Sequence, residues 1–433
     1  GTHRGGYDAF SFDVTEALRP GANEIVVRVQ NPLKVDVLDA QVVGKQRAKS
    51  EGIFYTAATG IWQTVWMEPV DSMHFERLKI TPDVDAEEVR IAAPRSEIAS
   101  DTATEVTVTD RGRVIAKQTF FMAQEFRIKI PKPHLWTPED PHLYGLRVRL
   151  IKGGDDDEVE SYFAMRKISL GKDERGRTTI LLNNRPYFQV GTLDQGYWPD
   201  GLYTAPTDAA LKWDIETTKR LGFNMIRKHA KTEPDRFYYW TDKLGMLVWQ
   251  DMPQAFTGKE DEMGTEANAQ WETEWREIMG ELHSHPSIVV WTVFNEGWGQ
   301  HETPRLTAWT KNLDPSRLVN SASGWFDREV GDLDDVHAYP EPGTDSPSAT
   351  RAAVNGEFGG ITMRVPGHMW TEDVMGYGTT LTDTWSVTKR YQELMRQAYA
   401  LRQSRGTCAF VYTQITDVEQ ESNGLLTYDR AVW

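Results

Sequence analysis

Two glutamates follow segments that are predicted to be buried strands. Residues 288–294 form a nearly continuous apolar run that stops at Asn295 and Glu296, and Glu357 follows a second predicted strand at 353–356. An apolar run without alternation is typical of a parallel strand that is covered on both faces. An ionisable group at the end of such a strand is costly for packing, yet it lies at the sheet edge where barrel enzymes hold their chemistry. We therefore expect both glutamates to be catalytic.

Two facing carboxylates suit the hydrolysis of a glycosidic bond. One carboxyl group protonates the leaving oxygen, and the other attacks the anomeric carbon or activates a water molecule. Strands four and seven of an eight-stranded ring lie on opposite sides, so Glu296 and Glu357 would face each other across its mouth. A single glutamate after a strand is more often a solvated loop residue, but the combination of Asn295, Glu296 and Glu357 favours catalysis.

The other predicted strands also lead to polar or aromatic side chains, which we expect to bind the substrate. These candidates are Asp194, Arg227, His229, Asn295, Trp298, His337, Tyr339, Tyr412 and Gln414. Arg227 could be a structural ion-pair partner, but an arginine beside a carboxylate nucleophile would also keep that group ionised. Trp298 and Trp198, in loops at the mouth, are candidates for stacking on a sugar ring, and packing in the core is the alternative.

No metal ion or cofactor is expected. The pair His283 and His285 has no third ligand at a matching spacing, so the end of a helix before Pro286 is a simpler interpretation than zinc binding. The acidic run at 155–157 is interpreted as a solvated hairpin tip rather than a calcium site. Cys408, the single cysteine, lies in an apolar run and is expected to be a buried, inert thiol.

Eight predicted strands carry the candidate side chains. After residue 168, strands alternate with helices such as 208–221 and 266–283, which indicates βα units and a parallel sheet. The strands are predicted at 187–193, 224–229, 247–250, 288–294, 318–321, 335–338, 353–356 and 408–413. Eight parallel strands with helices or loops between them predict a (β/α)8 TIM barrel over residues 168–433. The chain stops soon after strand eight, so we expect the barrel to lack a complete last helix.

Two β-rich segments precede the barrel. Residues 71–167 are expected to form an immunoglobulin-like β-sandwich, because seven short predicted strands are spaced by about ten residues with turn residues between them. Residues 1–70 contain alternating apolar positions at 10–14 and 25–29 and an aromatic-rich strand at 52–65. Three or four strands cannot close a sandwich by themselves. We therefore expect residues 1–70 to be the C-terminal part of a larger sandwich.

The composition limits the partners of the chain. A net charge of −16 argues against a nucleic-acid surface, which needs clustered Lys and Arg, and it suits a neutral partner. The sequence has no apolar run near the roughly 18 residues that a membrane span requires, so we expect a soluble chain that spans no membrane. The sequence gives no compartment, and it leaves the oligomeric state open, a homo-oligomer included.

The combined motifs resemble glycoside hydrolase family 2, which includes β-galactosidases, β-mannosidases and β-glucuronidases. The similarity covers essentially the whole chain and rests on HPSIVVWTVFNEGWGQ at 285–300, NMIRKHAK at 224–231, VNGEFGG at 354–360 and TQITDVEQESNGLLTYDR at 413–430. It implies a retaining mechanism, with Glu296 as the acid/base and Glu357 as the nucleophile. In that mechanism the two carboxyl groups lie about 5 to 5.5 Å apart.

The resemblance also implies roles for the residues around the two glutamates. Asn295 would lie near the sugar 2-hydroxyl, and Arg227 and Tyr339 would orient the nucleophile. Asp194 and His229 would line the pocket that binds the terminal sugar. The substrate is then a carbohydrate, and the activity is that of an exo-acting β-glycosidase.

Two departures from the family pattern bear on the sugar. Many relatives place a tryptophan at the end of strand eight, where this chain has Tyr412 and Gln414. Residues 1–70 match only the second half of the family's sugar-binding jelly-roll sandwich. The resemblance favours a terminal β-galactoside, whereas Lys228 and Lys231 keep a β-glucuronide open, since a uronate carboxylate pairs with Lys or Arg. A β-mannoside, an arabinoside and a non-catalytic carbohydrate-binding protein are the further alternatives.

Overall fold

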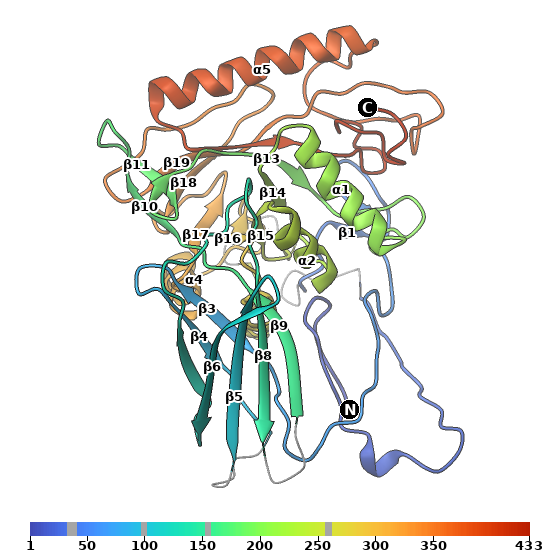
Figure 1. Cartoon of the computed structure of the whole chain (residues 1–433). Helices are drawn as coiled ribbons and strands as arrows, with labels where there is room; N and C mark the ends of the chain where they lie inside the picture. Colours follow the sequence, from blue (N-terminus) through green and yellow to red (C-terminus); the bar gives the residue numbers. More distant parts are fainter. Residues whose placement is uncertain (33–40, 97–101, 152–156, 256–261) are drawn as a thin grey trace.

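A computed structural model describes residues 1–32, 41–96, 102–151, 157–255 and 262–433 of the protein. A β-sandwich and an α/β barrel make up most of the chain (Figure 1). The sandwich lies at one end of the molecule, and the long helix α5 (Thr384–Arg405) lies across the barrel at the opposite end (Figure 1).

Eight parallel strands form the barrel. In chain order they are β13 (Gln189–Asp194), β14 (Met225–Lys228), β15 (Leu247–Asp251), β16 (Ile288–Asn295), β17 (Leu318–Ser323), β18 (Leu333–His337), β19 (Ala352–Gly359) and β20 (Ala409–Thr413). Ladders join them in the order β17-β16-β15-β14-β13-β20-β19-β18, and a bridge between Asn320 and Gly331 brings the two ends of this sheet together. The predicted TIM barrel is confirmed, and each predicted strand corresponds to one observed strand.

The central strand β16 is buried along its whole length because it is covered from both sides. On its outer side, Trp291 and Phe294 pack against Trp275 and Trp271 of α3 (Thr265–Leu282), with ring centroids 5.6 and 5.1 Å apart. The helix predicted at 266–283 is thus observed, and it packs on β16. The packing fixes the strand that ends at Glu296.

Three further helices flank the barrel strands, namely α1 (Asp208–Arg220), α2 (Asp235–Leu244) and α4 (Thr303–Leu313). The Oγ1 of Thr207 accepts a hydrogen bond from the backbone N–H of Ala210 at 3.0 Å, which caps the start of α1. Gly406 ends α5 with a φ of +86°, a conformation that glycine adopts at little cost. None of the helices in the described part of the chain is long and apolar enough to cross a membrane.

A small antiparallel sheet packs on the barrel and was not predicted from the sequence. It consists of β10 (Ile168–Lys172), β11 (Thr178–Leu182) and β12 (Arg185–Pro186). Ile168, Ile180 and Leu182 of this sheet share one apolar core with Leu193 and Trp249 of the barrel. The sheet is therefore part of the barrel's core rather than a separate unit.

The sandwich consists of two antiparallel sheets. One contains β3 (Lys79–Asp83), β4 (Glu88–Ala92) and β7 (Glu125–Lys129), and the other contains β5 (Ala103–Asp110), β6 (Arg113–Phe121), β8 (Tyr144–Ile151) and β9 (Asp157–Phe163). Buried and partly exposed residues alternate along β8, as in a strand with one face on a core. The predicted sandwich is confirmed. Residues 155 and 156 of the acidic run lie outside the described residues, and Asp157 is the first residue of β9.

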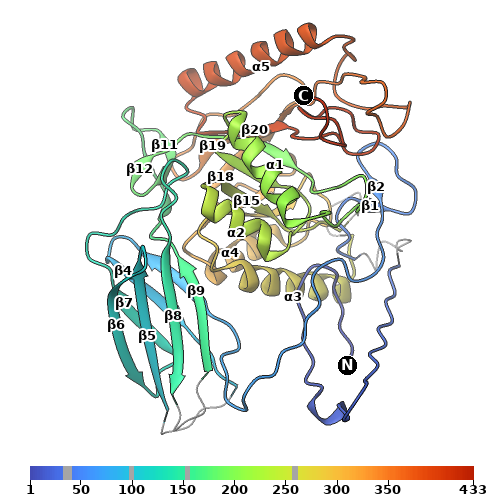
Figure 2. The same cartoon turned by 45° about the vertical axis from the view of Figure 1, so that its right-hand side comes forward.

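The amino-terminal segment contains less β-structure than the sequence predicted. Within the described residues 1–32 the expected strands at 10–14 and 25–29 are absent, and the short 3-10 turn η1 (Thr15–Ala17) is the regular element found there. Phe12 and Val27 are 48% and 58% exposed. Because no second sheet covers these apolar positions, forming a ladder would bury little of their surface. Figure 2 shows the part of this segment around η1 as an extended trace away from the barrel, whereas the N–H groups of Gly6 and Ala9 donate to Glu274 and Glu281 of α3.

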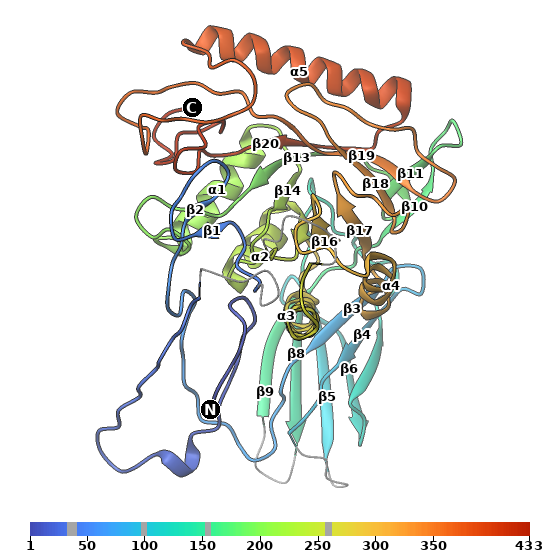
Figure 3. The same cartoon turned by 180° about the vertical axis from the view of Figure 1, so that it is seen from behind.

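Two short strands follow in the same segment. They are β1 (Gln46–Arg47) and β2 (Tyr55–Thr56), and they pair in parallel. They lie close to the carboxyl-terminal end of the chain (Figure 3), where the backbone N–H of Thr56 donates to the Glu419 carboxylate at 2.9 Å. This contact brings the amino-terminal segment to the barrel.

Candidate active site

Glu296 directly follows β16 in a left-handed backbone conformation, with a φ of +52°. Residues other than glycine adopt this conformation rarely, and they do so mostly at turns and functional sites. The Glu296 N–H donates to the carbonyl oxygen of Ser323 at 3.0 Å, which holds the turn. Its Oε1 accepts a hydrogen bond from Nδ1 of His337 at 2.7 Å.

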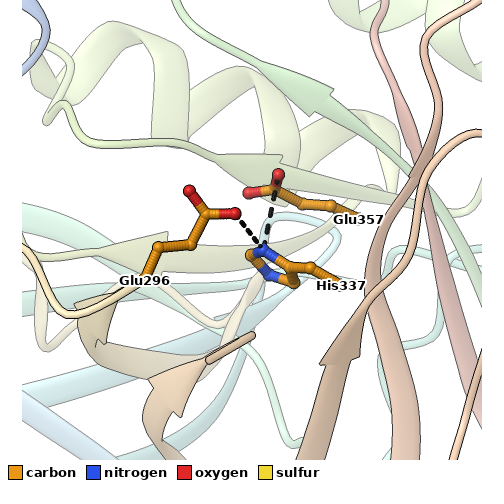
Figure 4. A group of neighbouring side chains, drawn as sticks. All are labelled: Glu296, His337 and Glu357. Atoms are coloured by element: carbon orange, nitrogen blue, oxygen red, sulfur yellow. Dashed lines mark hydrogen bonds and ion pairs between the residues drawn. The ribbon is translucent and has the colours of Figure 1, made fainter. Parts of the chain in front are cut away.

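Glu357 lies on β19 and is buried. Its Oε1 accepts from Nη1 of Arg227 at 3.2 Å, and its Oε2 accepts from the Tyr339 hydroxyl at 2.6 Å. Figure 4 shows Glu296 and Glu357 on either side of His337. The structure thus brings together the two glutamates that the sequence selected, from strands four and seven of the barrel.

His337 links the two carboxylates. Its Nδ1 lies 2.7 Å from Oε1 of Glu296 and 3.5 Å from Oε2 of Glu357. Its Nε2 lies 2.7 Å from Oγ of Ser323 and 3.3 Å from Nη1 of Arg227, and the Ser323 hydroxyl donates to Asp335 at 2.6 Å. Burial lowers the pKa of His337, but the charge of Glu357 and the bond to Glu296 outweigh burial, so its pKa is raised. The two acids therefore favour the protonated form of His337.

Among the residues that the structure describes, these three side chains also form the group that could hold a metal ion. Glu296, His337 and Glu357 each place one ligand atom within 4.8 Å of the other two. A histidine binds a metal through a deprotonated ring nitrogen, whereas both ring nitrogens of His337 are hydrogen-bonded and its pKa is raised. The arrangement fits acid–base chemistry better, and independence from metal stays a prediction.

Arg227 organises the nucleophile side of the site. It is fully buried, and its Nε and Nη2 bind the two oxygens of Asp251 at 3.1 and 3.0 Å. Its Nη2 also donates to Oδ1 of Asn295 at 2.7 Å, and its Nη1 donates to Glu357. Arg227 is therefore both a structural ion-pair partner and a contact of the catalytic glutamate, so the two alternatives from the sequence hold together.

Positive neighbours keep Glu357 ionised. Burial alone would raise the pKa of its carboxyl group, but the charges of His337, Arg227 and Lys45 outweigh burial and hold the pKa well below its usual range. A carboxylate that stays ionised is what a nucleophile requires.

Asn295 presents an unused donor to the site. Its Oδ1 is bonded to Arg227, while its Nδ2 is buried and has no hydrogen-bond partner among the described residues. Buried polar atoms in folded proteins nearly always have a partner. A hydroxyl group of a bound ligand would supply it, as expected for a residue that contacts the sugar.

His229 and Tyr339 also lie at the nucleophile. His229 Nδ1 is 2.8 Å from Asp251 and 4.0 Å from Glu357, and burial lowers the pKa of this histidine. The Tyr339 hydroxyl is 2.7 Å from Oγ1 of Thr413, and its ring stacks on Tyr377 at 3.8 Å. Both residues lie where the sequence predicted them.

The structure corrects the prediction for Asp194. Asp194 pairs in register with Lys228, which follows Arg227 on β14, and successive side chains of a strand point to opposite faces. Lys228 Nζ lies 2.7 Å from Asp194 and 2.9 Å from Glu233, and Lys231 Nζ lies 3.0 Å from Glu233. Asp194 therefore belongs to a buried ion-pair network outside the barrel lumen, and both lysines are paired within it.

Tyr412 is corrected for the same reason. Its ring packs on Phe358 at 5.6 Å and on Tyr391 of α5 at 5.2 Å. The next residue on β20, Thr413, reaches Tyr339 in the site, so alternation turns Tyr412 outward. The tyrosine fills the layer between the barrel and α5 and does not form a wall of the pocket.

Of the remaining predicted residues, two make structural contacts and one lies at the mouth of the barrel. Gln414 Nε2 donates to Oδ1 of Asn423 at 2.8 Å, so it holds the closing segment in place. Trp198 is buried, and the Arg430 guanidinium lies 3.9 Å from its ring centroid, so core packing was the correct alternative. Trp298 is partly exposed and stays a candidate for sugar contact.

The two histidines and the cysteine that we set aside make structural contacts. His283 is bonded to Oγ1 of Thr81 at 2.8 Å, and His285 is bonded to Asp242 at 2.7 Å. Burial raises the pKa of Cys408 to about 11, so its thiol stays protonated. These contacts agree with the expectation of structural roles.

Sequence reasoning missed the residues that reach the site from outside the strand ends. Tyr377 comes from the loop between β19 and α5, and Lys45 comes from the amino-terminal segment. Neither carries a local pattern that would have marked it. Ser323 is different, because it ends a strand that the sequence predicted two residues too short.

Both the barrel and the β-sandwich match models of known protein families. Residues 179–348 match the model "Glycosyl hydrolases family 2, TIM barrel domain", and residues 73–166 match the model "Glycosyl hydrolases family 2". A β-glucuronidase of Bacteroides fragilis is 26% identical over 350 residues, which cover 75% of this chain and 49% of that protein. A β-galactosidase of Leuconostoc mesenteroides is 24% identical over 357 residues, which cover 74% and 32%.

A solved structure has the same fold at low sequence identity. The β-galacturonidase of Eisenbergiella tayi, bound to galacturonate, aligns with a TM-score of 0.68 and 20% identity, covering 87% of this chain and 73% of that chain. The curated relatives are longer. This chain spans between 30% and 49% of the length of three of them.

Proposed function

We propose, from the membership of the chain in glycoside hydrolase family 2, that it is a glycoside hydrolase that acts on carbohydrate by a retaining β-glycosidase mechanism. Glu357 is the nucleophile and Glu296 is the acid/base. The observation that carries the proposal is the short distance between the two carboxylates, whose nearest oxygen atoms lie within 4.8 Å of each other. Retaining glycosidases place these groups about 5 to 5.5 Å apart, whereas inverting enzymes leave room for a water molecule at about 6.5 to 9.5 Å.

The first step forms a covalent glycosyl-enzyme. An oxygen of Glu357 attacks the anomeric carbon while the bond from that carbon to the leaving oxygen breaks, and Glu296 gives its proton to the leaving oxygen. Glu357 is suited to attack because Arg227 and Tyr339 bind its two oxygens and keep it ionised and oriented.

The second step releases the sugar. Glu296, now ionised, takes a proton from a water molecule that attacks the same carbon from the side of the departed group. The bond to Glu357 breaks, and the free sugar has its original configuration. The unpaired Nδ2 of Asn295 supports a contact with the sugar 2-hydroxyl during both steps, where such contacts strengthen in the transition state.

Two sugar classes are candidates. The sequence resemblance favours a terminal β-galactoside, and one relative is named as a β-galactosidase. A β-uronide is favoured by a specific observation, because the Lys45 ammonium lies near the catalytic glutamate. Lys228 and Lys231 no longer support a β-uronide substrate. Lys228 is paired with Asp194 and Glu233, and Lys231 is paired with Glu233.

The mechanism is tested by following the anomeric proton of the first-formed product by NMR, with an aryl β-glycoside as substrate. The β-anomer is expected before mutarotation. An α-anomer as the first product would exclude a glycosyl-enzyme intermediate. The sugar is tested by comparing kcat/KM on the p-nitrophenyl β-galactoside, glucuronide, mannoside and arabinoside.

The alternative from another class is a carbohydrate-binding protein without catalysis. Such a protein could lose Arg227, Tyr339 or either glutamate and keep its fold. All four side chains remain: Arg227 and Tyr339 bind Glu357, and Glu296 is joined to Glu357 through His337. Hydrolysis of any aryl β-glycoside that Glu357→Gln abolishes would exclude the binding protein.

A further inference from the structure

A segment from outside the barrel lies over the mouth of the site. We call residues 42–58 the strap. At its start, the backbone N–H groups of Val43 and Gly44 donate to the carbonyl oxygen of Gln254, which follows β15, at 3.2 and 3.0 Å. At its end, the Thr56 N–H donates to Glu419, which follows β20. The strap is thus bound at the carboxyl ends of two barrel strands.

The strap is packed too closely to move freely. Gly44 has a φ of +59°, and a Cβ atom there would lie 2.6 Å from the carbonyl oxygen of Ala230 and 2.7 Å from the Tyr203 hydroxyl. The backbone therefore lies directly against the loop that follows β14.

Lys45 is buried and faces the catalytic residues. The residue is 5% exposed, and its Nζ lies 5.8 Å from the ring centroid of Trp298 and 6.0 Å from that of Tyr55. Its charge acts on His229 and on Glu357. After burial, it is the next influence that lowers the pKa of His229, and it adds to the influences that lower the pKa of Glu357.

Lys45 differs from the other buried cations beside the site. Arg227 has Asp251 and Glu357 as partners, and the paired lysines are Lys228 and Lys231. For Lys45, no hydrogen bond or ion pair within 4 Å joins its ammonium group to any residue that the structure describes. A buried ammonium group without an acceptor is costly. An anionic or hydroxyl-bearing ligand would provide the acceptor.

We propose that Lys45 binds the carboxylate of a uronic-acid sugar at the non-reducing end, so that β-uronides are the preferred substrates. This inference rests on the proposed function. In a hexuronic acid the carboxylate is attached to the carbon on the far side of the ring oxygen from the anomeric carbon. A cation that recognises it must therefore lie beside the catalytic residues, and Lys45 is buried next to Trp298, the second residue after Glu296.

The charges around the pocket permit an acidic sugar. The acidic residues that the sequence placed at the mouth are neutralised, Asp251 by Arg227 and Asp194 by Lys228. A hydrogen bond between two charged groups is roughly twice as strong as one between neutral groups. A site built for a charged group also rejects an analogue that lacks it, because its own buried charge is left unpaired.

The experiment compares sugars that differ at one position. The kcat/KM of the chain is measured on p-nitrophenyl β-glucuronide and β-galacturonide and on the matching glucoside and galactoside. Lys45→Met removes the charge and keeps the length of the side chain, and Lys45→Arg restores a charge. Lys49→Met, at an exposed lysine of the strap, is the matched control.

The expected result is a preference for the uronide, which Lys45→Met reverses. The variant should lose about 10- to 100-fold more in kcat/KM on the uronide than on the hexoside, the range for a hydrogen bond to a charged group, because the effect of the Lys45 charge on Glu357 is common to both substrates. Lys49→Met should leave both values unchanged. Preference of the original chain for the hexoside, or an equal loss on both substrates in Lys45→Met, would overturn the inference and leave the retaining mechanism intact.

A binding measurement separates this inference from the proposed chemistry. Calorimetry with free glucuronate and galacturonate against glucose and galactose needs no turnover. Tighter binding of the acids, lost in Lys45→Met at an unchanged melting temperature, would support the role of Lys45 even in an inactive Glu357→Gln background. Equal binding of acids and neutral sugars would refute it, whereas absence of hydrolysis on all substrates would refute the proposed function.

Discussion

The two glutamates have different hydrogen-bond partners, and this difference supports their assignment. Glu357 receives bonds from Arg227 and Tyr339 and lies 3.5 Å from Nδ1 of His337. Glu296 stands on a turn and accepts a bond from His337. More donors favour the charged form of Glu357. The residue with more donors is thus better suited to be the nucleophile, as proposed.

Substitution of the two glutamates should separate their roles. Glu357→Gln should abolish turnover, since no nucleophile remains. Glu296→Ala should lower kcat on substrates with poor leaving groups by about 10² to 10⁴, the usual contribution of a general acid. Because Glu357 can still form the intermediate from an activated aryl glycoside, azide should restore the rate and yield a β-glycosyl azide. A β-glycosyl azide from the Glu357 variant, or an α-glycosyl azide from the Glu296 variant, would show that the roles are exchanged.

Substitution of Tyr339 and Tyr412 tests which side chains face the inside of the barrel and which face outward. Tyr339→Phe removes a donor from ionised Glu357, so the pKa of that carboxyl group should rise and the acid limb of the pH–rate profile should move to higher pH. The kcat/KM should fall by about 10-fold or more, as for a hydrogen bond to a charged group. Tyr412→Phe is the control and should leave the pH profile unchanged. An equal effect of both variants would contradict the described orientation.

At the scale of elements, the barrel was predictable because its signal is local. A strand covered on both faces must be apolar throughout, and β16 is such a strand. The direction of a side chain at a strand end was less predictable. A shift of one residue moves every side chain of a strand to the opposite face. Asp194 and Tyr412 were misplaced for this reason, although their strands were located correctly.

The amino-terminal strands were not predictable by the same logic. Alternation at 10–14 and 25–29 indicates a half-buried strand only if a second layer covers the apolar face. No layer covers Phe12 or Val27 in the structure. Contacts between distant segments leave no local pattern at all, and Lys45 reached the site from such a segment. The candidate residues at the strand ends could therefore be predicted from the sequence. The residues that surround them from distant segments could not.

The network outside β13 and β14 should matter for stability and not for sugar selectivity. Lys228 outweighs the effect of burial on Asp194 and lowers the pKa of that carboxyl group. A lowered pKa gives stability that is present above the unfolded value and is lost as pH falls through the folded value. Asp194→Asn should lower the Tm near neutral pH, since breaking a buried pair costs about 3 to 5 kcal/mol. The difference in Tm between the variant and the original chain should shrink in acid.

The ratio of kcat/KM between a uronide and a hexoside is the second measurement on Asp194→Asn. It should stay within about threefold of the original chain, because the carboxylate does not face the sugar. A large change in this ratio at an unchanged Tm would show that Asp194 contacts the sugar, as the sequence predicted.

At the scale of the whole molecule, the site is assembled from three parts of the chain. The barrel supplies both glutamates, the loop before α5 supplies Tyr377, and the strap supplies Lys45. The closing segment after β20 holds the strap through Glu419, and the Tyr55 hydroxyl of the strap bonds to Glu421. The stability of the closing segment therefore bears on the shape of the pocket.

Asp417 in this closing segment makes the stability of the molecule depend on pH. It is buried, and its Oδ1 accepts a hydrogen bond from the Gly424 N–H at 2.8 Å. Burial, together with the charge of Glu421, raises the pKa of its carboxyl group to about 8. The folded state then holds a proton that the unfolded state releases at about pH 4. The contribution to stability is complete below that pH and is lost as the pH rises through about 8.

Asp417→Asn should remove this dependence while keeping the shape of the side chain, because an amide oxygen can accept the same bond from Gly424. The amide carries no charge at any pH, so the cost of ionising a buried group disappears. The Tm of the variant should exceed that of the original chain by at least about 2 °C at about pH 8 and match it at about pH 4. Calorimetry at both values checks this, with Asp429→Asn, at a more exposed carboxylate of the same segment, as the control. A lower Tm of Asp417→Asn at the higher pH would mean that the ionised carboxylate, and not the protonated acid, holds the segment against the barrel.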